Sequence, residues 1–412
     1  MKKEIFEKII NSRSNALVSG SISSGKTTNI LLPIVDELME RKESFFFIDS
    51  KEEYINKYYD KLKENDYNII ILNLRDLDKS ESWNPFKYPY ELYKNGEHDK
   101  AQEYLEKIGS ILFYESSKNA DPFWSMTSSD FITGIALGLF EDGKINEINF
   151  NSINSMFNGI DVKIGSSDYI KEYFNLKGKL SSAYIHASTT FLAPRDTRDS
   201  ILSVVRQRLR LYVTREKLSK LMADTTFKYE DILAKPTAIF FIGKDESKYM
   251  NSLIAMFVDQ LFGYLLDSKN KNRFNFILDN LDSVEIINNL SDMMSSGISR
   301  NIKFFIGTRS IENLKEKYGD YIVKLADIIE IKNTEITLNI NGELNSEPKE
   351  FSDVVINDAE IEYPQLKNTD IELFDLISFV ISKKGKQHLD SKLNDVLHSN
   401  NSKNETTDLV SS

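Results

Sequence analysis

The chain has 412 residues, of which 41% are hydrophobic and 28% are charged, as in folded globular proteins rather than disordered or membrane-embedded ones. It contains no cysteine and only four histidines, which excludes disulfides and thiolate metal sites, argues against a histidine zinc site and fits a reducing cytoplasm. The net charge of −11 excludes nucleic-acid binding over the whole surface, so any DNA contact needs a local patch or a channel in an oligomer.

The N-terminus and the longest apolar stretches predict neither a secretion signal nor a transmembrane helix. Residues 1–8 carry charges throughout and have no apolar core. Residues 131–140 are too few to span a bilayer, and the run 253–266 is interrupted by Asp259 and Gln260. A cytoplasmic location is therefore predicted.

Short β-branched or aromatic runs recur along the chain, with helical patterns such as 29–40 and 248–266 between many of them. Most of these runs are continuously apolar, as expected for strands buried on both faces of a parallel sheet. This alternation of strands and helices predicts an α/β fold with a mostly parallel sheet flanked by helices. The predicted strands are residues 16–18, 44–49, 68–74, 237–243, 274–279, 302–308 and 327–331.

One internal region departs from this alternation. Residues 89–219 contain few strand-like runs and several amphipathic segments, including 100–114 and 131–140. We therefore predict a mostly helical insertion domain at 89–219. The flanking segments, 1–88 and 220–335, are predicted to form one nucleotide-binding domain.

The C-terminal part is predicted to be a separate extension. An Asn341-Gly342 pair between alternating residues predicts a β-hairpin within an acidic extension over 336–382. The acidic stretch 343–375 could dock a basic partner or form a solvated surface, and the second interpretation is favoured. The polar residues 383–412 are predicted to be disordered.

The first predicted strand is followed by a complete G-x-x-x-x-G-K-[ST] phosphate-binding loop, and an amphipathic helix comes after it. Glycines allow the tight turn that points successive backbone N–H groups at phosphates, and the following helix adds its dipole. Lys26 is predicted to reach the β and γ phosphates of ATP, and Thr27 to ligate Mg²⁺. The alternative, a Gly-Ser loop without a ligand, is disfavoured by this context. The predicted nucleotide-binding residues are Gly20, Ser21, Ile22, Ser23, Ser24, Gly25, Lys26, Thr27 and Thr28.

A phosphate-binding loop needs a second carboxylate for Mg²⁺, usually at the end of a buried apolar strand. Asp279, at the end of the run 274–279, is predicted to be this residue, so the predicted metal ligands are Thr27 and Asp279. Asp49 follows a similar run and is a rival, with a supporting role on the phosphate side as its expected function. Asp282 is a third possibility.

Taken together, these segments and several further motifs resemble the type IV coupling proteins, the TraG/TraD-like ATPases of conjugation and type IV secretion. The resemblance covers residues 15–332, and the order and spacing of the motifs make it specific. The matching segments are Asp49-Ser50-Lys51-Glu52-Glu53 for D-P-K-G-E, Trp83-Asn84-Pro85-Phe86 for W-N-P-F/L, Asp121-Pro122-Phe123-Trp124 for D-P-F-W, Asp279 in L-L-D-E-F, Gly297 to Ile302 for G-R-S-R-G-I, and Thr308 to Leu314 for Q-S-x-x-Q-L.

The resemblance implies a RecA-like P-loop motor domain with an all-α insertion that faces the transported DNA. It also implies a homo-oligomeric ring, for which a hexamer is considered, that acts with other type IV secretion components on single-stranded DNA or a relaxase–DNA complex. The family carries N-terminal membrane helices, whereas the loop here begins at Gly20. We therefore expect either that a partner tethers the chain to the inner face of the cell membrane or that the chain works away from the membrane.

Three positions depart from the family pattern. Asn280 replaces the water-activating glutamate, Ile298 replaces the first arginine of G-R-S-R-G-I, and Arg309 replaces the sensor glutamine. An amide cannot take a proton from water, and an arginine finger alone is worth about 10³–10⁵ in rate. Arg300 matches the second arginine and joins Lys26 and Asp279 as the predicted catalytic residues.

These departures leave two hypotheses open. The chain is either a DNA-transfer ATPase of the coupling class or a nucleotide-binding, hydrolysis-poor adaptor or assembly subunit of such a system. Asp282, Glu52 and Glu53 are the acids that could replace the missing base. An unrelated kinase or GTPase ranks last, because the chain has no N-K-x-D signature.

Two weaker sequence features concern DNA binding. Residues 195–220 carry eight basic side chains, which either track DNA phosphates or form the solvated side of an amphipathic helix. Phe123 and Trp124 either stack on bases or pack in a core. In both cases the structural interpretation is favoured.

Overall fold

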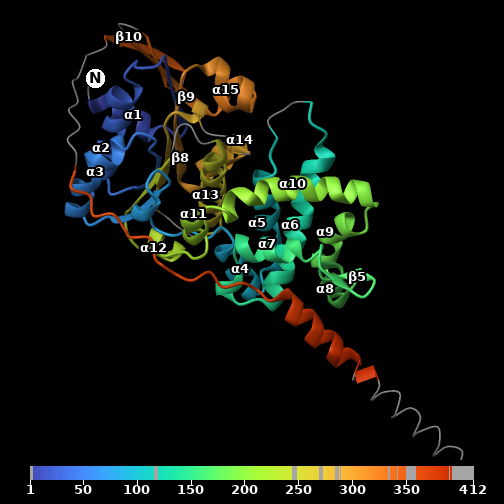
Figure 1. Ribbon diagram of the computed structural model, residues 1–412. Coiled ribbons are helices and arrows are strands. Elements are labelled where there is room, and N and C mark those ends of the chain that lie inside the picture. The colour runs from blue at the N-terminus through green and yellow to red at the C-terminus, as the bar shows by residue number, and fades with distance from the viewer. Residues whose placement is uncertain are drawn as a thin grey trace, which may run out of the picture. The chain divides into compact units, whose positions relative to one another are not determined.

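The computed structural model describes residues 3–115, 119–243, 248–268, 272–283, 287, 289–332, 335–340, 342–348, 359–388 and 390–391. The chain divides into two compact units (Figure 1). The first unit consists of Met1–Lys87 and Arg215–Asp370, and the second consists of Tyr88–Thr214 and Ile371–Ser412.

The described part of the first unit contains a nine-stranded sheet in the order β11-β10-β9-β1-β8-β7-β2-β6-β3. All seven strands from β9 to β3 in this order pair in parallel, and β10 and β11 form an antiparallel hairpin at one edge. Every predicted strand is present. The bounds are β1 Asn15–Gly20, β2 Ser44–Ile48, β3 Asn68–Asn73, β6 Thr237–Ile242, β7 Phe274–Leu278, β8 Ile302–Thr308, β9 Ala326–Ile331, β10 Glu335–Ile340 and β11 Glu343–Pro348.

Aromatic side chains fill both faces of this sheet. Residues of β1, β2 and β6 share one core with α1, α2 and α3, and Phe47 and Phe240 stack there at 4.9 Å. On the other face Phe46 lies against Phe257 of α13. Burial on both faces explains why these strands read as continuous apolar runs. The helices are α1 Lys3–Asn11, α2 Leu32–Glu40, α3 Glu53–Glu64, α11 Glu216–Leu221, α12 Tyr229–Ala234, α13 Lys248–Asp267, α14 Leu290–Gly297, α15 Ile311–Tyr318 and α16 Tyr321–Lys324, with short 3-10 turns at Leu77–Lys79, Leu281–Ser283 and Ile298–Arg300.

The second unit is mostly helical. Its core is built around α6, whose Phe131, Ile135 and Leu139 are fully buried, and a two-stranded β4–β5 ribbon is its small β component. The elements are α4 Lys87–Lys94, α5 His98–Leu112, α6 Pro122–Asp142, a 3-10 turn Ile145–Glu147, α7 Phe150–Asn158, β4 Lys163–Ile164, β5 Ser167–Asp168, α8 Tyr169–Lys177, α9 Ser182–Phe191 and α10 Arg195–Val213, followed near the C-terminus by a helix at residues 376–388.

The helix at 376–388 corrects the prediction that disorder begins at residue 383. Leu376 and Val380 are buried in the second unit, and the ring of Phe379 lies 5.5 Å from that of Tyr173. This i, i+4 apolar stripe gives the helix a face to bury, which the polar composition of the tail conceals. Residues 392–412, also predicted to be disordered, lie outside the described residues.

The acidic extension contains the predicted hairpin, since Ile340 pairs with Glu343 across the turn, although Asn341 itself lies outside the described residues. Residues 359–370 have no regular secondary structure and run along the first unit. Ile361 and Tyr363 pack against the core beneath α3, and the backbone carbonyl of Glu362 accepts a hydrogen bond from Tyr59. This part of the stretch is therefore more than a solvated surface. Among the described helices, none is long and apolar enough to cross a bilayer.

Candidate nucleotide-binding site

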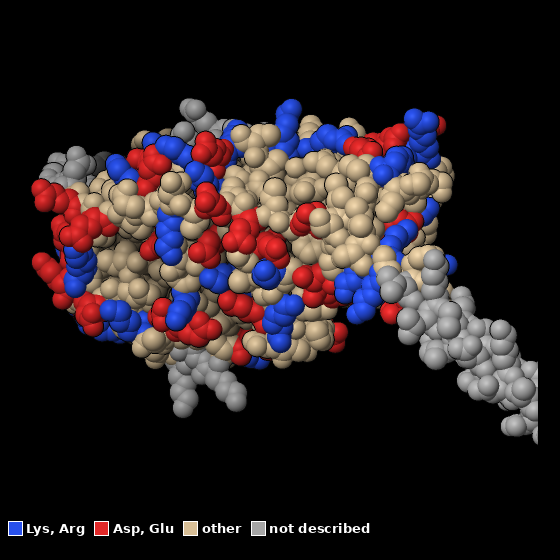
Figure 2. Space-filling model, turned by 60° about the horizontal axis from the view of Figure 1, so that its bottom comes forward, with Lys and Arg blue, Asp and Glu red and all other residues tan. Residues whose placement is uncertain are grey.

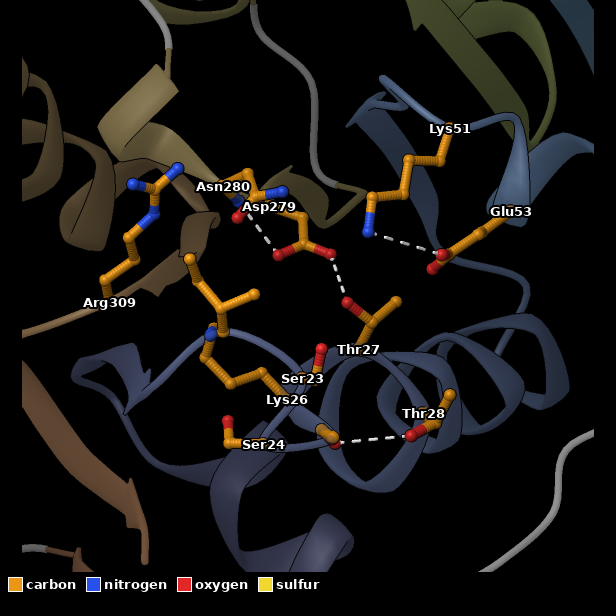
Figure 3. A pocket seen from close by; sticks show the side chains of 12 residues that line it. Ser23, Ser24, Lys26, Thr27, Thr28, Lys51, Glu53, Asp279, Asn280 and Arg309 are labelled. Carbon is orange, nitrogen blue, oxygen red and sulfur yellow. Dashed lines mark hydrogen bonds and ion pairs between the residues drawn. The ribbon is translucent and has the colours of Figure 1, made fainter. Parts of the chain in front are cut away.

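The candidate site lies where β1, β2, β7 and β8 end. Parallel strands present their carboxyl ends at one edge of a sheet, where open α/β folds bind ligands. A cavity of about 530 Å³ occupies this edge, within the range of ordinary ligand pockets (Figure 3). Its lining residues are Ile22, Ser23, Ser24, Gly25, Lys26, Thr27, Thr28, Lys51, Glu53, Asp279, Asn280 and Arg309.

The phosphate-binding loop has the backbone that its glycines predict. Gly25 has a φ of +84°, and a Cβ on it would lie 2.2 Å from Nδ2 of Asn29. The segment Thr27–Leu31 after the loop forms a π-helical turn before α2 begins at Leu32. Pro33 lacks the N–H that would donate to the preceding turn, which favours such a bulge. The helix predicted to begin at residue 29 therefore begins earlier, at Thr27, and its first turn is π-helical.

Lys26 is folded back onto the loop. Its ammonium group donates to the carbonyl oxygens of Gly20 at 2.7 Å and Ser21 at 3.1 Å. Burial lowers the pKa of Lys26, and the nearby carboxylates of Asp279 and Asp282 oppose that shift. A phosphate group at the loop would give this buried cation a stronger, charged partner than two carbonyls.

Thr27 and Asp279 come together across the cavity floor. The Thr27 hydroxyl donates to Oδ2 of Asp279 at 2.6 Å, and the other carboxylate oxygen accepts from the backbone N–H of Asn280 at 2.8 Å. One hydroxyl and one carboxylate supply the hard oxygen donors that Mg²⁺ takes from proteins while it keeps several waters. The donor set therefore fits Mg²⁺ at Thr27 and Asp279.

Two residues that support Asp279 were missed from the sequence. The hydroxyl of Tyr54, which is fully buried in α3, donates to Oδ2 of Asp279 at 3.1 Å. Gly307 of β8 leaves room for the same carboxylate, because a Cβ on Gly307 would lie 2.5 Å from its Oδ1. Neither position carries a motif; the helix after β2 brings Tyr54 to Asp279, and the pairing of β8 with β7 brings Gly307 there.

Charged side chains from two other loops complete the pocket. Lys51 and Glu53 follow β2 and face each other at 3.9 Å between Nζ and Oε1. Arg309 follows β8 and lies on the other side of Asp279 and Asn280 (Figure 3). Arg309 thus lines the pocket of its own chain.

Asp49 and Asp282, the other two candidates for the Mg²⁺ ligand, have other contacts. Asp49 is buried, and its carboxylate accepts the backbone N–H of Ile55 at 2.9 Å. It therefore caps the start of α3 rather than pairing with Thr27, and burial raises its pKa to about 7. Asp282 accepts from the Thr308 hydroxyl at 3.0 Å and from the backbone N–H of Arg309 at 2.6 Å, so it orders the loop after β8.

Arg300 lies away from the cavity of its own chain. It precedes β8, and Arg309, which lines the pocket, follows the opposite end of that strand, so about 20 Å of extended strand separates the two ends. Its guanidinium donates to the carbonyl oxygen of Leu266 at 2.9 Å. A catalytic role for Arg300 would thus require the pocket of a neighbouring subunit and remains a prediction.

The tryptophan motif after β3 has a structural role. Trp83 is buried, and its indole N–H donates to the hydroxyl of Tyr229 at 3.2 Å. That hydroxyl donates to Gln260, whose amide donates to the carbonyl oxygen of Pro85 at 2.7 Å. The motif thereby fastens the chain to α13 before the second unit begins.

The two sequence features that concern DNA binding, the basic helix and the Phe123–Trp124 pair, have different outcomes in the structure. The apolar face of α10 is buried through Ile201, Val205 and Leu209, which confirms the amphipathic interpretation. Arg206 pairs with Asp161 at 3.3 Å. Phe123 has 41% of its surface exposed, so the core-packing interpretation is wrong for this ring. On the face in Figure 2, basic and acidic side chains are interspersed.

The parallel sheet, the phosphate-binding loop and the Thr27–Asp279 pair define a RecA-like P-loop nucleotide-binding protein. A family model described as type IV secretory system conjugative DNA transfer matches residues 6–355. The chain therefore belongs to the family of type IV conjugative DNA-transfer coupling proteins, as the sequence motifs predict. A comparison with curated proteins found no significant match.

Solved structures support the fold. The plasmid coupling protein TrwB in complex with the non-hydrolysable ATP analogue ADPNP is 16% identical, with a TM-score of 0.58 over 82% of this chain and 78% of that one. TrwB in complex with ADP and Mg²⁺ is 17% identical, with a TM-score of 0.57 over 83% and 78%. VirB4 of Thermoanaerobacter pseudethanolicus is 10% identical, with a TM-score of 0.50 over 82% and 90%.

Proposed function

We propose that this chain binds Mg-ATP at the carboxyl edge of its sheet. The observation that carries the proposal is the 2.6 Å contact between Thr27 and Asp279 beneath a complete phosphate-binding loop. Backbone N–H groups of Gly20 to Thr28 hold the phosphates, and Lys26 leaves its two carbonyl partners to contact the β and γ phosphates. When Mg²⁺ is bound between Thr27 and Asp279, it neutralises charge on the same phosphates. TrwB, a similar fold, has been solved with ADP and Mg²⁺.

We further propose that the nucleotide-bound chain acts as a coupling protein. In this proposal the chain moves or recruits single-stranded DNA or a relaxase–DNA complex for conjugative transfer, together with other type IV secretion components. Membership of the family supports this assignment. The exposed ring of Phe123 and the largely exposed side chain of Arg195 in the second unit offer stacking and phosphate contacts to a single strand.

Assembly and location are part of the same proposal. Arg300 lies far from the pocket of its own chain, so it would act on nucleotide only from a neighbouring subunit of a homo-oligomer, with six subunits as the size to test. A partner would tether this assembly to the inner face of the membrane. Size measurement with and without Mg-ATP tests the oligomer.

A second candidate function is favoured by the substitutions at Asn280 and Ile298. Without the usual base and arginine, the chain would bind ATP as a structural switch and serve as a hydrolysis-poor adaptor or assembly subunit. The motor would then lie in another chain.

The test measures Mg-ATP binding and phosphate release by the purified protein, with and without single-stranded DNA, beside Lys26→Ala. Binding that requires Lys26, with DNA-stimulated release, supports the coupling ATPase. Tight binding with release at the Lys26→Ala background supports the adaptor. A wild-type protein that binds no Mg-ATP contradicts both candidates.

A further inference from the structure

The pocket lacks the glutamate that would follow Asp279, yet it contains another carboxylate. Asn280 occupies the base position and lines the cavity. Among the pocket residues, Asp279 already accepts hydrogen bonds from the hydroxyl groups of Thr27 and Tyr54. Among the described residues that line the cavity, Glu53 is the other acid.

The topology explains how Glu53 reaches the site. Strand β2 lies next to β7 and runs parallel to it, with Phe46 paired to Phe276 and Phe47 to Ile277. The chain leaves β2 at Ile48 and begins α3 at Glu53, so this side chain stands at the edge where Asp279 follows β7. A smaller cavity that shares residues with the main one is lined by Glu53 together with Thr27, Asp49, Asp279 and Asn280.

Among the residues that the structure describes, the other nearby acids have different partners or lie outside both cavities. Asp49 accepts backbone N–H groups at the start of α3, and Asp282 accepts from Thr308 and Arg309. Glu52 lines neither cavity, although it is adjacent in sequence. The carboxylate of Glu53 faces Lys51 at 3.9 Å, a distance beyond a hydrogen bond, and can therefore turn to a water.

The surroundings of Glu53 suit a proton acceptor. Its side chain is 32% exposed, which leaves access for one water while part of its hydration is lost. Burial, with a smaller contribution from the negative charge of Asp279, raises the pKa of Glu53, and the Lys51 ammonium opposes that shift. A base works best when its pKa approaches the working pH.

We propose that Glu53 is the base that activates the attacking water for ATP hydrolysis, in place of the residue at position 280. This inference rests on the proposed binding of Mg-ATP in the same pocket. Glu53 takes one proton from water as the water oxygen forms a bond to the γ-phosphorus. The bond from that phosphorus to the β–γ bridging oxygen breaks, and ADP leaves with the electron pair, so the products are ADP, inorganic phosphate and the proton on Glu53.

The experiment compares Glu53→Gln with Glu52→Gln, a matched change in the adjacent residue outside both cavities. Mg-ATP affinity is measured by calorimetry, and single-turnover hydrolysis is followed with γ-labelled ATP, with and without single-stranded DNA. Nucleotide that remains bound after a fixed incubation is identified by chromatography. Thermal unfolding of each variant verifies that it folds.

The proposal predicts that Glu53→Gln keeps its Mg-ATP affinity within about threefold, loses about 10²-fold or more in hydrolysis rate and retains ATP rather than ADP. Glu52→Gln should behave as the wild type does. In the Glu53→Gln background, Asn280→Glu should restore part of the rate, because it returns a carboxylate beside Asp279.

Different outcomes separate this inference from the function on which it rests. If the wild type hydrolyses ATP and Glu53→Gln does so equally fast, Glu53 is not the base, while the coupling ATPase stands. If the wild type binds Mg-ATP but hydrolyses it no faster than Lys26→Ala, the inference fails and the adaptor function stands. If the wild type does not bind Mg-ATP, both the inference and the proposed function fail.

Discussion

The two sides of the nucleotide pocket differ in how they are built. On the phosphate-binding side, the loop Gly20 to Thr27 matches its motif in full, and Thr27 contacts Asp279 directly. On the proposed hydrolytic side, Asn280 follows Asp279, and the charged residues Lys51, Glu53 and Arg309 come from the loops after β2 and β8. Phosphate binding depends on a fixed backbone conformation, whereas a base needs only a carboxylate within reach of one water. The second requirement can be met from another strand.

The largest expected effect comes from Lys26→Ala on the binding side. The change removes the cation that would contact the β and γ phosphates, so Mg-ATP affinity should fall by about 100-fold or more. A ligand present at about 100 times its Kd stabilises the folded state by about 2.7 kcal/mol, so ATP should raise the Tm of the wild type but not of the variant. Lys51→Ala is the matched control, because Lys51 lies on the hydrolytic side. An equal loss of the ATP-induced shift in both variants would contradict the division between the two sides.

Gly307→Ala should have the next largest effect. A Cβ at Gly307 would overlap Oδ1 of Asp279, so the carboxylate must shift from the position in which it contacts Thr27. Such overpacking costs about 1–3 kcal/mol, and we expect roughly tenfold weaker Mg²⁺-dependent ATP binding in a Mg²⁺ titration. The control is Gly243→Ala, at the end of β6, where a Cβ would meet Ile254 at an ordinary 3.4 Å. Unchanged Mg²⁺ dependence in Gly307→Ala would show that the position of Asp279 does not matter.

Tyr54→Phe should have a smaller effect on the same carboxylate. The variant keeps the ring against Phe47 but loses the hydrogen bond to Asp279, so Mg-ATP affinity should fall by a few fold. One hydrogen bond is worth about 0.5–1.5 kcal/mol of stability. Tyr59→Phe lies on the same helix and loses a bond to the carbonyl oxygen of Glu362 instead. Calorimetry should show weaker binding only in Tyr54→Phe, and equal affinities would remove Tyr54 from the site.

The substitution Asp49→Asn should have the smallest effect on Mg-ATP binding. It should, however, change how the free energy of unfolding depends on pH. Burial raises the pKa of Asp49 from the ordinary 3.8 to about 7, so its contribution to folding is fully present below pH 3.8 and is lost as the pH rises through 7. Asp49→Asn removes this dependence. The stability of the variant relative to the wild type should therefore rise by a few kcal/mol across that window, since one pKa unit corresponds to about 1.4 kcal/mol. Urea unfolding at about pH 5 and about pH 8 measures it, and parallel changes in both proteins would contradict the assignment.

The sequence predicts the binding side better than the hydrolytic side, for a physical reason. The strands, the loop and Asp279 depend on local patterns: apolar runs, glycine spacing and a carboxylate at a strand end. Tyr54 and Gly307 contribute through strand order, and no single stretch of sequence records that β2 and β8 flank β7. The helix at 376–388 was missed for a similar reason, because its apolar face is short and its partner Tyr173 is distant in sequence.

The most direct test of the central claim is a structure of the protein with Mg²⁺ and a non-hydrolysable ATP analogue. We predict that the phosphates lie in the loop Gly20 to Thr28, that Lys26 leaves the carbonyl oxygens of Gly20 and Ser21 to contact them, and that Mg²⁺ lies between Thr27 and Asp279. The carboxylate of Glu53 should face a water near the γ-phosphorus. Nucleotide bound elsewhere, or Lys26 still on the two carbonyls beside bound phosphates, would contradict the account.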